Sequence, residues 1–172
     1  MKRIMIIGGH GAGKTTLALR LGKATGLPVI HIDKSYYFPR WKLRPLREAL
    51  AELEAYTESE AWIMDGDDFR SFAPRLKRAD MIVYLHVSTV KRIVRYAKRA
   101  IKSFGKPRVD LPDGCKGKLG LNGLKWVVFG YPLKMRPEMH RAMAEMASKI
   151  PVVHVRSEAD IQMLEARLAA DA

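Results

Sequence analysis

Apolar residues along the chain fall into short runs that alternate with longer stretches of helical spacing. Short apolar runs bounded by glycine, proline or aspartate are typical of buried strands in a parallel sheet, and apolar positions three or four residues apart predict helices. The predicted strands are 3–7, 29–32, 62–64, 81–86 and 152–155. The predicted helices are 14–25, 46–59, about 89–102, 124–129, 132–148 and 158–170. This alternation predicts an α/β protein with a five-stranded parallel sheet covered on both faces.

Length and composition fit one domain over residues 1–172. Of these residues, 48% are apolar and 28% are charged, which is enough for one core and requires no second domain. The apolar run that follows Arg3 is too short for a signal peptide or a membrane span. The single cysteine, Cys115, fits a reducing compartment, and we expect it to be an ordinary loop thiol. We therefore expect a soluble, cytoplasmic protein with no membrane partner.

A glycine-rich motif lies between the first predicted strand and the first predicted helix. Residues 8–15, GGHGAGKT, fit the pattern G-x-x-x-x-G-K-[ST] in the strand-turn-helix context that this motif requires, which a simple glycine-rich turn does not explain. Its backbone amides and the helix N-terminus are suited to a triphosphate. We predict ATP and Mg²⁺ here, with Lys14 reaching the β- and γ-phosphates and the Thr15 hydroxyl on the metal. The predicted nucleotide contacts are Gly8, Gly9, His10, Gly11, Ala12, Gly13, Lys14, Thr15 and Thr16.

The large histidine inside this loop requires a separate expectation. Its side chain has to point away from bound phosphates, so we expect His10 to face the solvent and to take no part in catalysis.

Positive charge is concentrated in one part of the chain. The net charge is +13, and residues 91–156 carry 16 basic and 4 acidic side chains. A field of this kind attracts phosphates on a nucleotide, a phosphorylated metabolite or a nucleic acid. Charge alone does not choose among these partners.

Four segments together resemble a known family. Residues 1–15, 27–34, 62–66 and the segment around Asp113-Gly114-Cys115 resemble the adenylate-kinase-like P-loop kinases, in particular small proteins described as DNA topology modulation (FlaR-related) proteins or predicted kinases. The resemblance covers nearly the whole chain. It implies a three-layer P-loop NTPase fold with a mobile lid at about 103–130. It also implies transfer of the γ-phosphoryl group of ATP to a small acceptor that is nucleotide- or nucleoside-like.

The same resemblance implies roles for single residues. Asp33, after the second strand, would orient the acceptor hydroxyl or a metal-bound water, and a turn cap is the alternative. Asp65 would lie near magnesium, Arg70 near the acceptor phosphate and Arg156 near the adenine. His86 stands where the family pattern has an aspartate, so we expect a partly buried histidine there and not a metal ligand.

The predicted helix over about 89–102 is basic, with six cationic and no acidic residues between 91 and 102. Its apolar residues share one helical face, which we expect to pack against the domain while the other face is cationic. These apolar residues are Val90, Ile93, Val94, Ala97 and Ile101. The resemblance implies that Arg92, Arg95 and Arg99 reach the transferring phosphoryl group, where they would stabilise charge in the transition state. A solvated surface is the alternative.

The segment 35–60 would bind the acceptor, with Tyr37 and Arg44 among its contacts. Aromatic and basic residues are interleaved there, and they suit either stacking on a nucleoside or packing of the following helix onto the sheet.

Two other functions remain open. The first is a nucleic-acid-associated regulatory NTPase that uses the basic region 91–156, although the chain shows no helix-turn-helix, zinc-ligand or RNA-recognition signature. The second is nucleotide binding with little catalysis, which His86 in place of the family aspartate would allow. We expect a monomer or a homodimer in either case.

Overall fold

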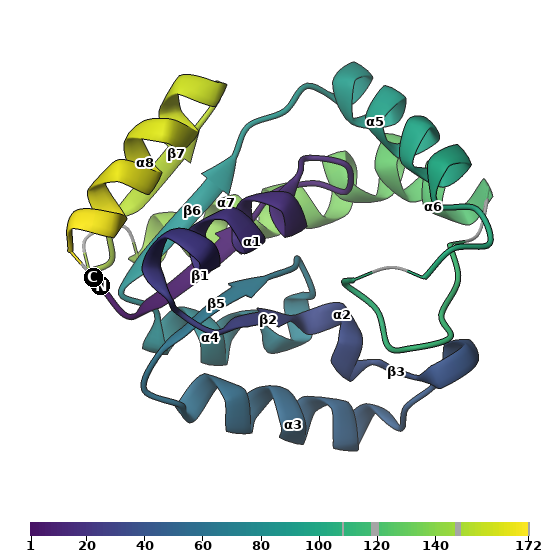
Figure 1. The fold of residues 1–172 in the computed structure, drawn as a ribbon, viewed down its shortest axis with the longest axis horizontal. Helices are drawn as coiled ribbons and strands as arrows, with labels where there is room; N and C mark the ends of the chain where they lie inside the picture. Colours follow the sequence, from purple (N-terminus) through teal and green to yellow (C-terminus); the bar gives the residue numbers. More distant parts are fainter. Residues whose placement is uncertain (108, 118–120, 147–148, 172) are drawn as a thin grey trace.

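The centre of the molecule is a parallel five-stranded sheet. The computed structural model describes residues 1–107, 109–117, 121–146 and 149–171. The strand order is β2-β5-β1-β6-β7, and all neighbouring pairs are parallel. The bounds are β1 Arg3–Ile7, β2 Val29–His31, β5 Trp62–Asp65, β6 Met81–Leu85 and β7 Val152–Val155. This confirms the predicted α/β class and its five-stranded parallel sheet (Figure 1).

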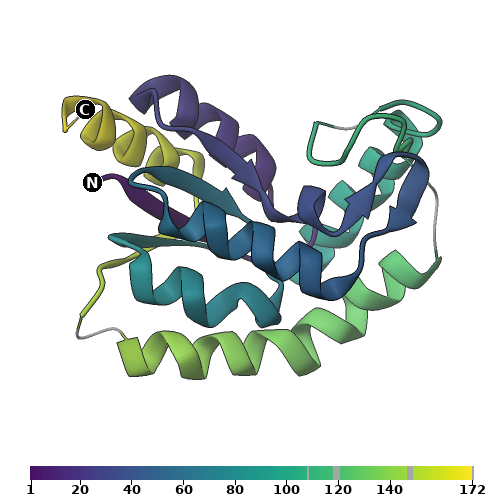
Figure 2. The same cartoon turned by 90° about the horizontal axis from the view of Figure 1, so that it is seen from below.

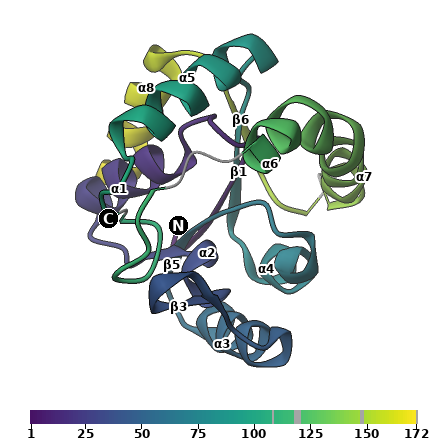
Figure 3. The same ribbon diagram turned by 90° about the vertical axis from the view of Figure 1, so that its right-hand side faces the viewer.

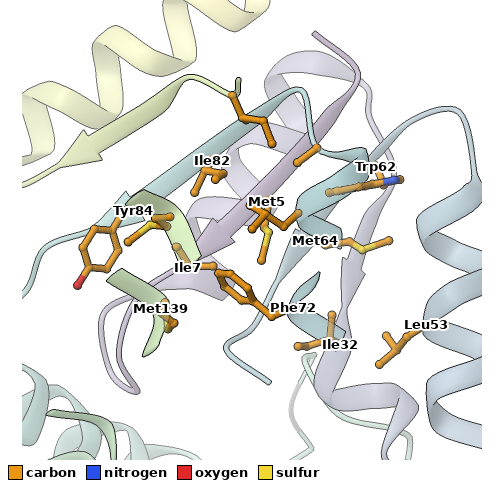
Figure 4. Close-up of a cluster of buried hydrophobic side chains, with 14 of the residues drawn as sticks. Met5, Ile7, Ile32, Leu53, Trp62, Met64, Phe72, Ile82, Tyr84 and Met139 are labelled. Carbon is orange, nitrogen blue, oxygen red and sulfur yellow. The ribbon is translucent and has the colours of Figure 1, made fainter. Parts of the chain in front are cut away.

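Helices cover both faces of the sheet, as expected for a three-layer fold (Figure 3). One face packs against α1 (Lys14–Thr25) and α8 (Glu158–Ala170) through residues such as Leu17, Leu21 and Leu164. The other face packs against α3 (Leu46–Glu58), α4 (Phe72–Arg78) and α7 (Arg136–Met146). The core on that side includes Met5, Ile7, Leu53, Trp62, Met64, Phe72, Ile82 and Met139 (Figure 4). No helix within the described ranges is long and apolar enough to cross a membrane.

A single helical run follows the segment expected to be a lid. It consists of α6 (Leu121–Lys125), η3 (Trp126–Met135) and α7, and it extends along one side of the molecule (Figure 2). The prediction of two separate helices at 124–129 and 132–148 was therefore wrong, and positions 147 and 148 lie outside the described residues. The middle part is a π-helix that contains Pro132, because wide turns accommodate a residue without an amide N–H. Gly130 permits this path, since a Cβ there would lie 2.1 Å from Cε3 of Trp126.

Several short elements between the main ones were not predicted. They are α2 (Ile32–Ser35), β3 (Tyr37–Phe38), η1 (Pro39–Trp41), β4 (Lys42–Leu43), η2 (Phe69–Ser71) and α4. Strands β3 and β4 form a two-stranded antiparallel hairpin that precedes α3. Elements of two to seven residues show no measurable periodicity, which is why the apolar pattern did not reveal them.

The orientation of α5 (Thr89–Lys102) contradicts the sequence prediction. Its bounds agree with the prediction, and the side chain of its N-cap residue, Ser88, accepts a hydrogen bond from the amide of Lys91. However, Val90, Val94 and Ile101 of the apolar face are 71%, 46% and 71% exposed, and Arg92 on the opposite face is 3% exposed. The helix turns Arg92 inward because the ring of Tyr131 lies beside its guanidinium group, and Arg95, although exposed, donates to a carbonyl of the glycine loop.

Candidate active site

The carboxyl ends of the central strands open into a cleft of about 610 Å³. This is the usual place for ligands in open α/β sheets. Strand β1 leads into the glycine loop, β2 into α2, and β5 into the acidic loop 66–68. The cleft is lined by parts of the glycine loop, α2, the β3–β4 hairpin, the acidic loop, α5 and the segment after it. The topology therefore brings the residues predicted from three separate motifs to one cavity.

The glycine loop adopts a backbone that only glycine tolerates at its tightest points. Gly11 and Gly13 have φ values of 81° and 102°. A Cβ on Gly11 would lie 2.6 Å from the carbonyl oxygen of Arg92, so the loop passes directly against α5. The loop ends at α1, whose first residue is Lys14 and whose N-terminal amides face the cleft side of the sheet. This arrangement is suited to hold an anion at a helix N-terminus.

Lys14 is tied to a carboxylate that the sequence analysis had assigned no role. Its ammonium donates to Oδ2 of Asp67 over 2.7 Å and to the carbonyl of Gly8 over 2.6 Å. The other oxygen of Asp67 accepts a hydrogen bond from the amide of Gly8 at 3.1 Å. Asp67 is 5% exposed. Through these hydrogen bonds it joins the acidic loop to both ends of the glycine loop. The signal available in the sequence was its place in a run of acidic residues directly after β5.

Thr15 and Asp65, which were both predicted to contact magnesium, lie next to each other. The Thr15 hydroxyl donates to Oδ2 of Asp65 at 2.9 Å, and Oδ1 of Asp65 lies 2.5 Å from Nδ1 of the buried His31. Hydroxyl and carboxylate oxygens are the ligands that Mg²⁺ prefers, and this ion commonly takes its other ligands from phosphates and water. The described residues contain no group of three side chains that would hold a metal unaided. The pair therefore fits a magnesium ion that arrives with a triphosphate.

Asp33 lies in the first turn of α2 and lines the same cleft. Desolvation by the surrounding protein raises the pKa of its carboxyl group to about 6. The charge of Lys14 opposes this rise, and the charges of Asp65 and Asp110 add to it. Although the side chain is exposed to the cleft, its carboxylate is thus a better proton acceptor than an ordinary aspartate. A group of this kind is suited to act as a general base near neutral pH.

The three arginines of α5 occupy different positions. Arg99 lines the cleft. Arg95 donates to the carbonyl of Ala12 at 3.1 Å and, with Arg99, lines a second pocket of about 310 Å³ beside the glycine loop. Arg92 is buried behind the loop: it lies 4.8 Å from the ring centre of Tyr131 and donates to the Thr89 hydroxyl. Burial lowers the pKa of Arg92.

Three predicted nucleotide contacts differ in their surroundings. His10 is half-buried, lines the cleft and packs edge-on against Trp126, with 6.3 Å between ring centres, so the expectation of a solvent-facing side chain was wrong. Thr16 lines the second pocket. Arg156 is exposed in the connection between β7 and α8, and neither pocket includes it among its lining residues.

The predicted acceptor contacts Tyr37, Arg44 and Arg70 all line the cleft. Arg70 pairs with Asp68 at 2.9 Å, and its guanidinium lies over the ring of Tyr36, 4.8 Å from the ring centre. Arg44 pairs with Glu52 and lies over the ring of Phe38. Tyr37 packs against Trp41. The aromatic residues of this region therefore both pack the hairpin and face the cleft.

The described part of the segment after α5 packs against the hairpin. Cys115 is fully buried; its sulfur accepts a hydrogen bond from the amide of Trp41 at 3.2 Å, and the indole of Trp41 donates to the carbonyl of Lys116. Asp110 and Leu111 are buried as well, and Asp110 lines the cleft. Cys115 is thus more than an ordinary loop thiol. Residues 108 and 118–120 of the predicted lid lie outside the described residues, and residues 121–130 are helical.

His86 is partly buried, as expected, and its Nε2 lies 2.7 Å from Nδ1 of His154. Burial, together with the charges of His154 and Arg156, lowers the pKa of His86.

Similar known proteins identify the fold of this chain but not its substrate. No protein-family model and no curated protein matches the sequence. A shikimate kinase from Acinetobacter baumannii, solved with shikimate, is 18% identical with a TM-score of 0.57, and the match covers 99% of this chain and 93% of the kinase. A gluconokinase from Sinorhizobium meliloti is 15% identical with a TM-score of 0.53, covering 99% and 94%. A deoxyadenosine kinase from M. mycoides is 15% identical with a TM-score of 0.51, covering 98% and 99%.

All three similar structures are kinases, and each match spans nearly the whole of both chains. The chain therefore has the fold of the P-loop kinases. In this chain, the motif GGHGAGKT leads from the end of β1 into the start of α1.

Proposed function

We propose that this protein is an ATP-dependent kinase that transfers the γ-phosphoryl group to a hydroxyl of a small nucleotide- or nucleoside-like acceptor. The observation that supports it most is the cleft itself, which is lined both by Lys14 and Thr15 of the glycine loop and by Asp33, a carboxylate with a raised pKa. The shared fold of three kinases and the resemblance to the adenylate-kinase-like and DNA topology modulation proteins agree with this proposal.

In the proposed reaction, the hydroxyl oxygen of the acceptor attacks the γ-phosphorus of ATP. The bond from this phosphorus to the β,γ-bridging oxygen breaks, ADP leaves, and Asp33 takes the proton of the hydroxyl. Lys14 exchanges Asp67 for the β- and γ-phosphates, and Arg99 neutralises charge on the phosphoryl group. Thr15 and Asp65 would hold Mg²⁺, which neutralises phosphate charge when bound.

The surroundings of the cleft have their own proposed roles. The second pocket, beside Gly13, Thr16 and Arg95, would take the nucleoside part of ATP. The segment from about 103 to 130 would act as a lid that excludes water during transfer. We place the protein in the cytoplasm as a monomer or homodimer.

A direct test measures binding and transfer separately. A non-hydrolysable ATP analogue with Mg²⁺ is titrated calorimetrically into wild type, Lys14→Ala and Asp33→Asn. We expect Lys14→Ala to weaken binding strongly and Asp33→Asn to leave it nearly unchanged while abolishing acceptor-dependent ADP formation. Because loss of Lys14 leaves the buried Asp67 unpaired, the unfolding curve of that variant has to be recorded as well. Binding that is insensitive to Lys14 in a folded variant would refute the proposal.

The exposed lysines of α5 keep one alternative function in view. Lys91, Lys98 and Lys102 project from this helix into solvent, where they suit a nucleic-acid backbone. A regulatory NTPase of this type would bind DNA or RNA with an affinity that falls steeply between 50 and 200 mM salt, as a general property of phosphate contacts. Binding to a glycine-loop nucleotide site is expected to change far less over the same range.

A further inference from the structure

Helix α5 presents its apolar face to solvent instead of burying it. Val90, Val94 and Ile101 are 71%, 46% and 71% exposed, and Ala97 between them is exposed as well. In a helix of 3.6 residues per turn, these four residues fall on one line, which we call the apolar stripe. The helix lies at the periphery of the molecule, as Figures 1 and 3 show. Contiguous exposed apolar side chains of this kind mark an interaction surface, whereas single ones are ordinary.

A row of lysines runs beside the apolar stripe. Lys91, Lys98 and Lys102 are exposed, and they fall on a second line about a quarter turn around the helix. In the part of the chain that the structure describes, none of the three forms a salt bridge. The sequence from 91 to 109 contains eight basic residues and no acidic one. The surface next to the stripe is therefore cationic and is complementary to an anionic partner.

The shape of this surface is convex. Neither of the two cavities beside the glycine loop is lined by a residue of the apolar stripe, so the stripe forms a ridge and not a groove. Exposed apolar side chains continue beyond the end of the helix, since Phe104 and Val109 are 64% and 62% exposed. An amphipathic helix of a partner protein commonly binds in a groove, which this ridge does not offer.

Two other partners satisfy only part of this surface. A nucleic-acid backbone would pair with the lysines but would leave the apolar stripe in water. A second copy that docked through its own α5 would cover the stripe, but it would bring two cationic surfaces together without an acidic residue to compensate them. A membrane surface with anionic headgroups satisfies both, because it offers phosphates to the lysines and an apolar layer to the stripe.

We propose that α5 is an interfacial helix that binds the protein reversibly to a membrane surface rich in anionic phospholipid. The helix lies in the plane of the surface, the apolar stripe enters the boundary between headgroups and acyl chains, and the lysines contact headgroup phosphates. This helix of 14 residues lies on the membrane and does not cross it. The short apolar runs of the sequence, on which the expectation of no membrane partner was based, exclude only a spanning segment.

The docking face and the glycine loop lie on opposite sides of α5. A Cβ on Gly11 would lie 2.6 Å from the carbonyl oxygen of Arg92, and Arg92 is about half a turn around the helix from the apolar stripe. Docking therefore leaves the glycine loop uncovered and brings it within about 10 Å, the diameter of one helix, of the lipid surface.

The test measures sedimentation of the protein with vesicles of phosphatidylcholine alone and of equal parts phosphatidylcholine and phosphatidylglycerol. We expect at least about tenfold tighter binding to the mixed vesicles, because each lysine near an anionic surface contributes about fivefold. Ile101→Ser should lower this affinity about tenfold at any salt concentration, since an apolar side chain no longer leaves water. Lys98→Gln/Lys102→Gln should lower it about tenfold at low salt and less as salt screens the charges.

Matched controls carry the same changes away from α5. Met163→Ser changes a residue of α8 that is 65% exposed, and Lys23→Gln/Lys77→Gln removes two exposed lysines of α1 and α4. We expect both variants to bind the mixed vesicles as wild type does. Because the altered side chains are exposed, urea unfolding curves of all four variants should match that of wild type.

Three results would overturn the proposal. They are absence of vesicle binding, equal binding to neutral and mixed vesicles, and binding that Ile101→Ser leaves unchanged. In the first case, binding of duplex DNA that is insensitive to Ile101→Ser would assign the lysines to nucleic acid. Self-association in sedimentation equilibrium that Ile101→Ser abolishes would instead assign the apolar stripe to a second copy. The test does not measure phosphoryl transfer, so failure of membrane docking leaves the proposed kinase function intact.

Discussion

The donor side and the acceptor side of the cleft are built in different ways. On the donor side, the glycine loop binds through backbone groups that one continuous sequence of eight residues supplies, and Gly8, Ala12 and Lys14 are held within that loop or by Asp67. The acceptor side is formed by α2, the β3–β4 hairpin and the acidic loop. There, side chains from other elements hold several cleft residues, as Glu52 of α3 holds Arg44 and Asp68 holds the Tyr36 hydroxyl. Local sequence thus determines the first side, and long-range packing determines the second.

This difference explains what substitutions should do on each side. A change in the glycine loop acts on backbone geometry and therefore on any nucleotide. A change on the acceptor side removes one partner of a pair and acts on a single step or a single substrate.

The largest expected effect is that of Asp33→Asn on catalysis. Removal of a general base typically lowers the rate by 10²–10⁴, and we expect kcat to fall about 10³-fold with little change in the affinity for Mg·ATP analogue. Steady-state ADP formation and calorimetry measure the two quantities. Asp113→Asn is the control. A comparable loss of ATP binding in Asp33→Asn would show that the two sides of the cleft are not separable.

The next effect concerns the support beneath the acidic loop. Arg75 is completely buried and donates to the carbonyls of Ser71, Gly66 and Asp68. Arg75→Met leaves these carbonyls without a donor, and we expect the free energy of unfolding in urea to fall by about 3 kcal/mol. Arg78→Met, at a more exposed arginine of the same helix, should cost less than about 1 kcal/mol. Equal losses in the two variants would contradict the supporting role of Arg75.

A smaller effect is expected in the pH dependence of the reaction. Because transfer requires ionised Asp33, whose pKa is raised to about 6, kcat/KM should rise with pH up to about 6 and then level off. This rise of kcat/KM with pH should be absent from the residual activity of Asp33→Asn. If kcat/KM instead rose near pH 4, where an unperturbed aspartate titrates, the result would contradict the environment assigned to Asp33.

The smallest effect is on stability. Folding raises the pKa of Asp33 above the ordinary value of 3.8 for an aspartate, so the folded state loses stability as the pH rises from about 4 through about 6. Asp33→Asn removes this cost and should therefore stabilise the protein at pH 8 but not at pH 4. Since water reaches the carboxyl in the cleft, we expect a gain below about 1 kcal/mol. Urea unfolding at the two pH values measures this gain in the free energy of unfolding. A gain at pH 4 alone would contradict the predicted direction of the pKa shift.

The sequence predicted the donor side well for a physical reason. The strand, loop and helix that hold Lys14 and Thr15 are contiguous, and the apolar pattern predicted the bounds of β1 and α1 as they are observed. Asp33 and Asp65 were predicted from the family resemblance; in the structure Asp65 is the last residue of β5 and Asp33 lies two residues after the end of β2, both at the edge of the sheet that faces the cleft.

The remaining features depend on contacts between distant segments. The engagement of Lys14 with Asp67 spans 53 positions, and that of Trp41 with Cys115 spans 74. The buried position of Arg92 in α5 could not be predicted either, because an apolar stripe normally marks the buried face of a helix, and here the glycine loop and Tyr131 lie against the other face. Asp110 gave no signal in the sequence beyond being an acidic residue in a basic segment.

The most direct test of the kinase function follows the γ-phosphoryl group itself. Wild type and Asp33→Asn are incubated with Mg²⁺, γ-labelled ATP and the most active acceptor, and the label is measured in acceptor, inorganic phosphate and remaining ATP. The proposed function predicts that wild type transfers the label to the acceptor with little release to water, and that Asp33→Asn binds ATP but transfers about 10³-fold more slowly. Label that appears only as inorganic phosphate, at a rate independent of acceptor and of Asp33, would contradict it.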